Sequence, residues 1–439
     1  MYLLSKLNLN RNNYFSYILA LFPLSFIAGN MIININIILI IFSALIFFRS
    51  NLFRIKFYFL DKIIITYFLL ILFTAVINDY YFFTEKLTWK GYFGTIKKSF
   101  FFLKYLFLYI ILRFLVEKNL IELKIFFISS TIAVIFVSFD IFYQFLNGKD
   151  IFGFPIIGRK LSGPFGDELI AGGFIQRYSL FAFFLVPIFF RNYKINKFSK
   201  FIIPFLFLIL FSSIILSGNR MPIIMFLFTA IMILFFQQNI RKFLFLFLLI
   251  FSLVYSAFFK YSDTVRLNFW SFYDQVYKMT SLIKQKDFFN DNSPHYMKEF
   301  SSFYNTWLIN KNFGGGIKNF RYYCRKRQDI PSNASIPCNM HPHNYYLEIL
   351  TETGFVGFLI TLLIFFNILY LTFIKKYFSN SNIKDNNLIT PFIFLFIAEI
   401  FPFKNTGSFF TTGNTTYLFL IIGVMIGIVR RYNSVENNK

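Results

Sequence analysis

The residues best suited to acid–base chemistry are three histidines, His295, His341 and His343, which share one hydrophilic stretch near positions 259–353. Asn344 follows His343, and its side chain can accept hydrogen bonds from the free amides of a first helical turn. We therefore expect a helix to begin at Asn344 with His343 immediately outside it. The positive end of such a helix would stabilise an anion, for example a diphosphate, and would favour a neutral imidazole that can accept a proton.

The residues on either side of this helix start indicate whether it could bind a polar substrate or a metal ion. Glu348 and Glu352 would share one face with Tyr345, which makes Glu348 a candidate for contact with a polar substrate. His341 and His343 could chelate a metal from an extended strand, but no third ligand follows at a telling spacing. We expect neither a metal nor another cofactor. The plainer interpretation of His343 is a loop histidine at the surface of a membrane.

A second candidate is Arg220, which follows the tight turn 217–219 and precedes Pro222 at the start of another apolar segment. An arginine at the edge of a bilayer is costly unless it faces protein, water or an anion. Its planar fork suits phosphate oxygens in a way that a lysine ammonium does not. The alternative is that Arg220 reaches outward to lipid headgroups.

Two glycine-rich segments carry further cations. The segment 158–168 contains Arg159, and Gln176 and Arg177 follow at the opening of the next apolar run. The segment 314–321 begins with three glycines and ends with Arg321, so it could bring its backbone and a cation close to an anion. For the first segment, a re-entrant or lining loop and an ordinary surface loop both remain open.

The composition places these segments in a membrane protein. The 439 residues are 57% hydrophobic, and apolar runs of bilayer-spanning length recur along the chain. The formal charge of +24 comes from basic residues dispersed between those runs, which argues against a nucleic-acid-binding face. The first apolar stretch lacks a cleavage site, so we expect a retained helix.

The hydropathy pattern predicts an all-α integral membrane protein with about twelve transmembrane helices. We expect helices near 14–29, 31–48, 62–77, 97–116, 121–146, 177–190, 201–216, 221–236, 241–258, 354–374, 389–403 and 414–429. Twelve spans place both termini on one side. The loops on that side hold 21 basic residues and the short opposite loops hold 10, which predicts cytoplasmic termini.

This topology divides the chain into three parts. Residues 1–258 form helices one to nine, residues 259–353 form a long loop domain on the outer side, and residues 354–439 form helices ten to twelve with a cytoplasmic tail. Both cysteines, Cys324 and Cys338, fall in the outer loop, which faces the oxidising periplasm in a Gram-negative bacterium. We expect them to form a disulfide worth about 3 kcal/mol on chain-entropy grounds, two free thiols being the alternative.

Around His343 the chain resembles the superfamily of O-antigen ligases and O-antigen polymerases. The ligase pattern is His, then Asn, Ser or Gln, nine residues, Gly, two residues, and Gly, Thr or Tyr; here it runs from His343 to Gly354 and Gly357. A Ser-Gly-x-Arg turn, a Ser-Gly-Pro-Phe-Gly loop and a Gly-x-Gly-x-x-x-Phe-Arg stretch are also frequent in that superfamily. All of them occur here, on the expected outer face.

This resemblance implies a metal-independent transfer of a glycan from undecaprenyl diphosphate to an acceptor hydroxyl. The acceptor would be lipid A core for a ligase, or a second lipid-linked glycan for a polymerase. The resemblance makes His343 the candidate base, Arg220 an essential arginine, and Arg321 or Arg266 the second one. It places the enzyme in the bacterial inner membrane, among membrane lipids, with its active site facing the periplasm.

Within the superfamily, the full pattern after His343 favours a ligase over a polymerase. A non-enzymatic polysaccharide transporter or flippase is the competing class. The clearest ionisable residues inside the expected spans, Lys104, Asp140 and Glu399, all lie in the outward half. An ion-coupled transporter would be expected to place charges near the midplane, so their position disfavours that class.

Overall fold

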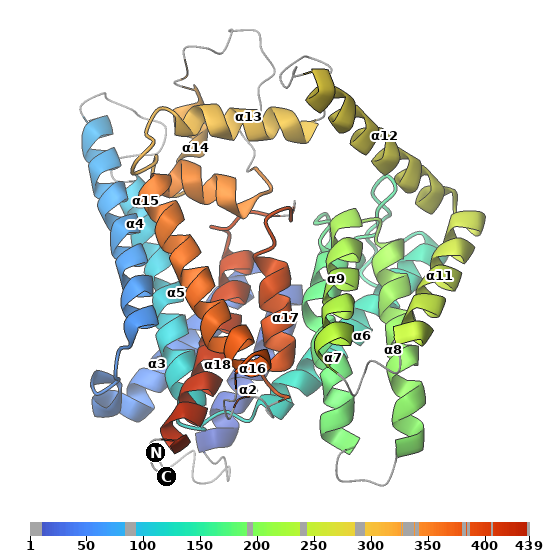
Figure 1. Ribbon diagram of the computed structural model, residues 1–439, viewed down its shortest axis with the longest axis horizontal. Helices are drawn as coiled ribbons and strands as arrows, with labels where there is room; N and C mark the ends of the chain where they lie inside the picture. Colours follow the sequence, from blue (N-terminus) through green and yellow to red (C-terminus); the bar gives the residue numbers. More distant parts are fainter. Residues whose placement is uncertain are drawn as a thin grey trace.

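The computed structural model is a bundle of helices (Figure 1). It describes residues 11–83, 94–190, 196–237, 244–285, 295–325, 327, 338, 342–379, 383, 387–404 and 407–436. Within these residues there is no β-strand, only two isolated bridges in the loop after the fifth expected span. The all-α class predicted from the hydropathy pattern is therefore confirmed.

The upright helices make up the body of the molecule. Six of the described helices are long and apolar enough to cross a membrane, and five shorter apolar helices accompany them. In chain order the upright helices are α2 (Arg11–Ala28), α3 (Asn30–Phe53), α4 (Phe59–Phe83), α5 (Gly94–Glu117), α6 (Leu123–Asn147), α7 (Ala171–Phe190), α8 (Asn196–Leu216), α9 (Arg220–Phe236), α11 (Leu244–Tyr261), α15 (Tyr345–Leu369), α17 (Thr390–Glu399) and α18 (Thr412–Glu436).

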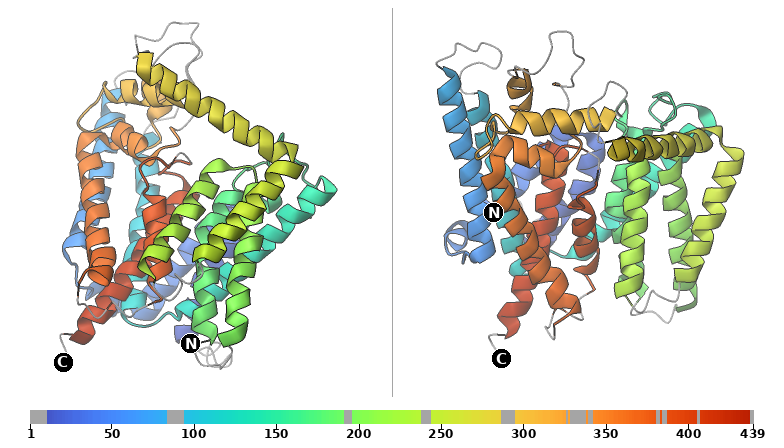
Figure 2. Two further views of the ribbon diagram at one scale, coloured as in Figure 1. Left: turned by 45° about the vertical axis from the view of Figure 1, so that its right-hand side comes forward. Right: turned by 45° about the horizontal axis from the view of Figure 1, so that its top comes forward.

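The remaining helices lie at the ends of the bundle. A π-helical turn (Tyr370–Ile374) and α16 (Lys375–Tyr377) extend α15. Between α11 and α15 the chain forms α12 (Asp263–Gln285), α13 (His295–Trp307) and α14 (Phe320–Arg325). In both views of Figure 2, α12 and α13 lie across the tops of the upright helices. The helices α12, α13 and α14, all within the hydrophilic stretch, thus form a helical cap over one end of the bundle.

Close contact between α5 and α18 forms the centre of the bundle. A Cβ added at Gly427 would lie 2.7 Å from Cβ of Val116, and one at Gly423 would lie 3.0 Å from Cβ of Leu112. Small residues let membrane helices approach at backbone distance, where dispersion contacts replace the hydrophobic driving force that lipid does not supply. The two glycines therefore explain how α18 comes to be almost wholly buried.

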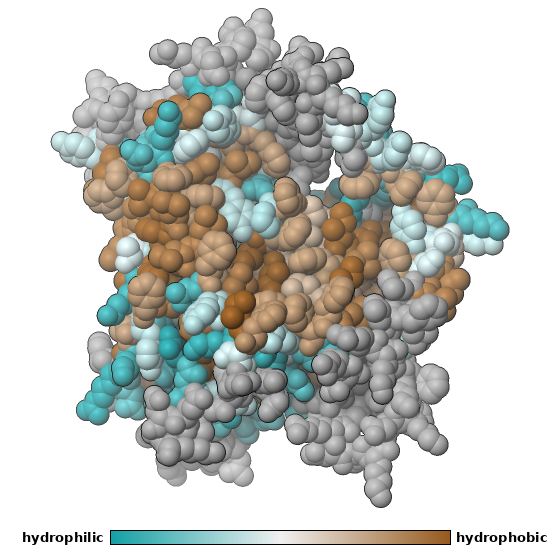
Figure 3. Space-filling view, viewed as in Figure 1, coloured by the Kyte–Doolittle hydropathy of each residue, from teal (hydrophilic) through white to brown (hydrophobic). Residues whose placement is uncertain are grey.

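Polar residues mark the two ends of this bundle. In the space-filling view, apolar side chains cover the middle of the visible face and hydrophilic side chains gather toward its ends (Figure 3). The last turn of α18 lies at the end opposite the cap (Figure 1). Near that end Arg113 is fully buried and pairs with Asp61 at 3.2 Å. Arg113 therefore lies inside the bundle, although its position in the sequence suggested a basic loop.

Candidate functional site

The start of α15 carries the predicted histidine. Asn344 is its N-cap, and its Oδ1 accepts hydrogen bonds from the amides of Tyr346 and Leu347 at 3.0 and 3.1 Å. His343 stands directly before this cap, half-buried, in the left-handed conformation with φ of 49°. Such a φ is uncommon outside glycine, and histidine is among the residue types that tolerate it. His343 therefore lies immediately outside the capped start of α15, as the sequence predicts.

A segment from the far end of the chain holds this helix start. Asn344 Nδ2 donates to the carbonyl of Pro402 at 2.8 Å, and the hydroxyl of Tyr346 donates to the carbonyl of Ile400. Between them, the hydroxyl of Tyr345 donates to Oε1 of Glu399 at 2.5 Å. Asn344, Tyr345 and Tyr346 at the start of α15 thus bind the last residue of α17 and the short stretch that follows it. This stretch fixes the backbone on which His343 stands.

Glu399 is the centre of a buried charge cluster. Its two carboxylate oxygens accept from Arg177 at 2.6 and 3.2 Å, and Lys404 Nζ lies 2.6 Å from Oε2. Asn414 Oδ1 accepts a further bond from Arg177 at 2.7 Å. Arg177 lies on the second turn of α7 and does not open the helix, because α7 begins at Ala171.

This cluster has more cations than carboxylates. Two cations meet one carboxylate, and the side chains of Lys404 and Arg177 are only 7% and 17% exposed. Burial lowers the pKa of Lys404 to about 8, and the charge of Arg177 acts in the same direction, while Glu399 opposes both. An anion brought to this end of the bundle would therefore meet an excess of positive charge that a single carboxylate leaves uncompensated.

Glu348, a predicted substrate contact, is buried one turn into α15. Its oxygens accept from the hydroxyl of Ser408 and from the amide of Phe409, both at 2.5 Å. These bonds tie α15 to the loop before α18. The structure thus gives Glu348 two partners within the protein and leaves its side chain 3% exposed.

Gly354, the first glycine of the histidine motif, breaks α15. Gly354 has φ of 68° in the middle of the helix, so the turn around it cannot form its own hydrogen bonds. The glycine-rich loop 311–316 supplies them. The amides of Gly315 and Gly316 donate to the carbonyls of Thr351 and Glu352, and the amides of Phe355 and Val356 donate to the carbonyls of Lys311 and Asn312.

Only glycine fits at this contact. A Cβ on Gly354 would lie 2.2 Å from the carbonyl oxygen of Asn312, and one on Gly314 would lie 2.5 Å from the amide nitrogen of Gly354. Glu352, just before the break, accepts from the amide of Lys318 at 2.6 Å. The glycines 314–316 and Gly354 are therefore parts of one structural unit that joins the cap to α15.

Arg220 is placed at the first residue of α9 by the tight turn before it. The side chain of Asn219 donates to the carbonyl of Leu169 at 3.0 Å, which anchors the turn. The guanidinium of Arg220 donates to the hydroxyl of Ser271 on α12 at 2.9 Å and lies 5.8 Å from the ring of Phe272. The cap helix α12 thus covers Arg220.

The other predicted cations lie around this turn or on the cap. Arg159 is exposed, and its carbonyl oxygen would lie 2.8 Å from a Cβ on Gly218, two residues before Arg220. Arg266 is on the first turn of α12, where it pairs with Asp263 on the surface. Gln176 is buried on α7 beside Arg177, and Arg321 is exposed on α14.

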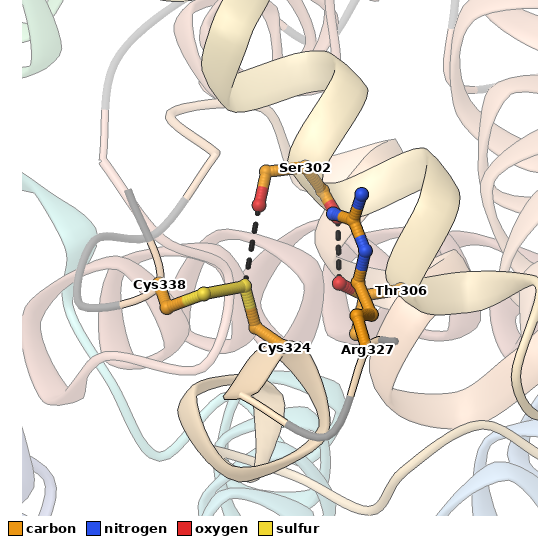
Figure 4. Close-up of a disulfide and its surroundings, with 5 residues drawn as sticks. All are labelled: Ser302, Thr306, Cys324, Arg327 and Cys338. Atoms are coloured by element: carbon orange, nitrogen blue, oxygen red, sulfur yellow. Dashed lines mark hydrogen bonds between the residues drawn. A yellow bond between two sulfur atoms is a disulfide. The ribbon is translucent and has the colours of Figure 1, made fainter. Parts of the chain in front are cut away.

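The disulfide lies below α13 (Figure 4). The sulfurs of Cys324 and Cys338 are 2.07 Å apart, and Ser302 of α13 contacts Cys324 at 3.3 Å. The ring of Phe320 stacks on Phe303 next to this bond. The disulfide therefore links Cys338 to α14, the helix that carries Arg321. His341 lies outside the described residues.

The fold and this geometry can be compared with known protein families. Residues 205–362 match the family model described as O-antigen ligase. The superfamily resemblance read from the sequence is thus confirmed, and a search of the curated proteins gives no match. Among the described residues, no group of three or more His, Cys, Asp or Glu side chains is placed to hold a metal ion.

The O-antigen ligase match separates the site into two parts. It includes Arg220, Arg266, Arg321, His343 and the glycine break of α15. The groups that hold the start of α15 lie outside this match: Arg177 is on α7, Glu399 ends α17, Lys404 and Ser408 are in the loop between α17 and α18, and Asn414 is on α18. Sequence reasoning noticed Glu399 only as an ionisable residue in an apolar segment. Its role as the centre of the cluster depends on contacts between segments more than 200 residues apart.

Proposed function

We propose that the protein transfers a glycan from undecaprenyl diphosphate to an acceptor hydroxyl of lipid A core or a similar acceptor. The reaction takes place at the periplasmic face of the bacterial inner membrane. The observation that carries the proposal is the position of His343, immediately outside the capped start of α15, within the stretch that matches the O-antigen ligase family.

In this reaction the acceptor oxygen forms a bond to the anomeric carbon, and the bond from that carbon to the diphosphate breaks. The imidazole of His343 accepts the hydroxyl proton, which general-base catalysis of this kind requires. Undecaprenyl diphosphate leaves with its electron pair and its negative charge. Arg220 faces that charge as it develops, and Arg321 or Arg266 from the cap is the second cation.

The contacts of Arg220 indicate how the donor enters. The guanidinium binds Ser271 of α12, so an incoming diphosphate replaces a neutral hydroxyl with charged oxygens. Hydrogen bonds between ionised groups are about twice as strong as neutral ones, which favours this exchange. We assign to the donor Arg159, whose backbone packs against the same turn, and Gln176 of α7. We assign Arg177, Asn344 and Glu348 to the framework that positions His343 for the substrate.

The proposed topology has twelve spans, cytoplasmic termini and the cap in the periplasm. It can be tested with a cysteine at Asp167, an exposed residue of the loop between α6 and α7. A membrane-impermeant maleimide added to intact spheroplasts should label this cysteine. Labelling only after the membrane is opened would reverse the orientation.

A deletion strain tests the reaction itself. Loss of a ligase leaves finished polymer on undecaprenyl diphosphate, whereas loss of a polymerase leaves single lipid-linked repeat units. We expect accumulated polymer and an acceptor lipid without glycan. Accumulated single repeats would show that the protein is a polymerase. Lipid-linked repeats that remain on the cytoplasmic side would show that it is a flippase and neither a ligase nor a polymerase.

A further inference from the structure

Two buried carboxylates at the outer end of α6 have no function in glycan transfer. Asp140 and Asp150 are 0% and 3% exposed. Asp140 Oδ1 accepts from the amide of Ile151 at 2.8 Å, and Asp150 Oδ1 accepts from the amide of Phe154 at 2.6 Å. The two side chains are therefore held by the same loop, 148–166, which folds back over the end of α6.

Each of these carboxylates has a second oxygen without a protein partner. Oδ2 of Asp140, Oδ2 of Asp150 and the hydroxyl of Ser162 are all buried without a hydrogen bond in the described part of the chain. Ser162 and Asp140 lie close together, because a Cβ on Gly163, next to Ser162, would lie 3.9 Å from Oδ2 of Asp140. Asp150 directly precedes Ile151, whose amide binds Asp140.

The charges at this place are not balanced by the protein. No ion pair to Asp140 or Asp150 is found among the described residues, and the basic side chains of the same loop, Lys149, Arg159 and Lys160, are exposed. Burying a carboxylate without a counter-charge costs several kcal/mol. Two carboxylates that interact with each other need either a cation or a proton between them.

We propose that Asp140, Asp150 and Ser162 bind a hard divalent cation, with calcium preferred to magnesium. All the available donors are oxygens, and two carboxylates balance a charge of +2. Calcium accepts carboxylates, hydroxyls and backbone carbonyls from an irregular loop, whereas magnesium demands octahedral geometry and keeps several of its waters. A site this deeply buried has little room for those waters.

The loop that closes over this site also supports the turn before Arg220. Gln144, one turn beyond Asp140 on α6, accepts from the amide of Gly163 at 3.0 Å and donates to carbonyls of the same loop. The backbone of Arg159 packs against Gly218, two residues before Arg220. The bound cation therefore stabilises a loop whose far side shapes the candidate active site, while taking no part in bond making.

Calcium binding to the purified full-length protein tests this inference independently of glycan transfer. After treatment with EDTA, the protein is titrated with calcium chloride or magnesium chloride, and its thermal unfolding is followed. We expect saturable binding of one calcium ion per chain and a midpoint several degrees higher with calcium. The variants Asp140→Asn and Asp150→Asn lose both effects, and Asp167→Asn, an exposed acidic residue of the same loop, keeps them.

Two results would overturn the cation site. One is the absence of saturable binding for both calcium and magnesium, which would mean that the carboxylates share a proton. The other is unchanged binding in both Asp140→Asn and Asp150→Asn. Asp150 lies in the loop outside α6, so its variant remains informative if a change at Asp140 impairs folding.

Discussion

The guanidinium of Arg177 binds both carboxylate oxygens of Glu399, at 2.6 and 3.2 Å, across 222 residues of sequence. Glu399 also accepts from Tyr345, the first residue of α15, and so connects α7 and α17 to the helix that follows His343. The catalytic geometry proposed for the cap is thus set by an ion pair within the bundle.

Replacing Glu399 with Gln removes the only carboxylate of this cluster found in the described chain. Arg177 and Lys404 would then be buried without a counter-charge, which typically costs about 3–5 kcal/mol. Thermal or denaturant unfolding of the purified protein measures the loss. The matched control is Asp263→Asn, which breaks the exposed pair with Arg266 and should cost less than about 1 kcal/mol. Equal stabilities of the two variants would argue against the cluster as the support of α15.

Replacing Gly354 with Ala should separate α15 from the loop 311–316. The added Cβ would meet the carbonyl of Asn312 and would force an alanine to a positive φ, so we expect a loss of more than about 2 kcal/mol together with loss of transfer. Gly173→Ala is the control, because a Cβ there meets no atom within 4 Å. A stable and active Gly354→Ala protein would contradict the inserted loop.

The stability of the protein should depend on pH through Lys404. Its pKa is lowered to about 8 by burial, whereas the unfolded chain titrates near 10.5. Between these pH values Lys404 binds more protons in the unfolded state than in the folded state. The free energy of unfolding therefore rises with pH through this group. Compared with Lys404→Met, the wild type should gain up to about 3 kcal/mol from pH 7 to pH 10.5. A parallel pH dependence of the two unfolding midpoints would contradict the lowered pKa.

Arg220 should not be replaceable by lysine. The proposed role requires a planar fork that meets two diphosphate oxygens, and a lysine ammonium offers a point charge instead. Arg220→Lys is expected to lower kcat about 100-fold or more, as the loss of a group that stabilises developing charge commonly does. Steady-state kinetics with a lipid-linked donor measures this change. An unaltered kcat with only a raised KM would assign Arg220 to ground-state binding.

The elements of the site that could be predicted from sequence are those that rest on local chemistry. Asn344 caps α15 because an asparagine next to a helix start satisfies free amides wherever the helix packs. The helical class follows equally from the apolar runs, because a bilayer requires every backbone group to be satisfied within the segment.

The elements that could not be predicted depend on contacts between distant segments. The sequence places Gly354 in a recognisable motif but does not show why a glycine is required there. The loop 311–316, which bonds to the break in α15, reaches it only when the cap is folded onto α15. The sequence predicts Arg177 at the opening of a span, whereas α7 begins six residues earlier, at Ala171. The pairing of Arg177 with Glu399 has no signal in either segment alone.

The central claim is that His343 accepts the proton of the acceptor hydroxyl. It is tested most directly by the transfer rate of purified His343→Ala, with saturating lipid-linked glycan and acceptor, relative to the wild type. We expect the rate to fall by about 100-fold or more while the unfolding midpoint stays unchanged. Lys278→Ala, which alters an exposed pair on α12, should keep the full rate. A wild-type rate in a correctly folded His343→Ala protein would contradict the proposed role of His343.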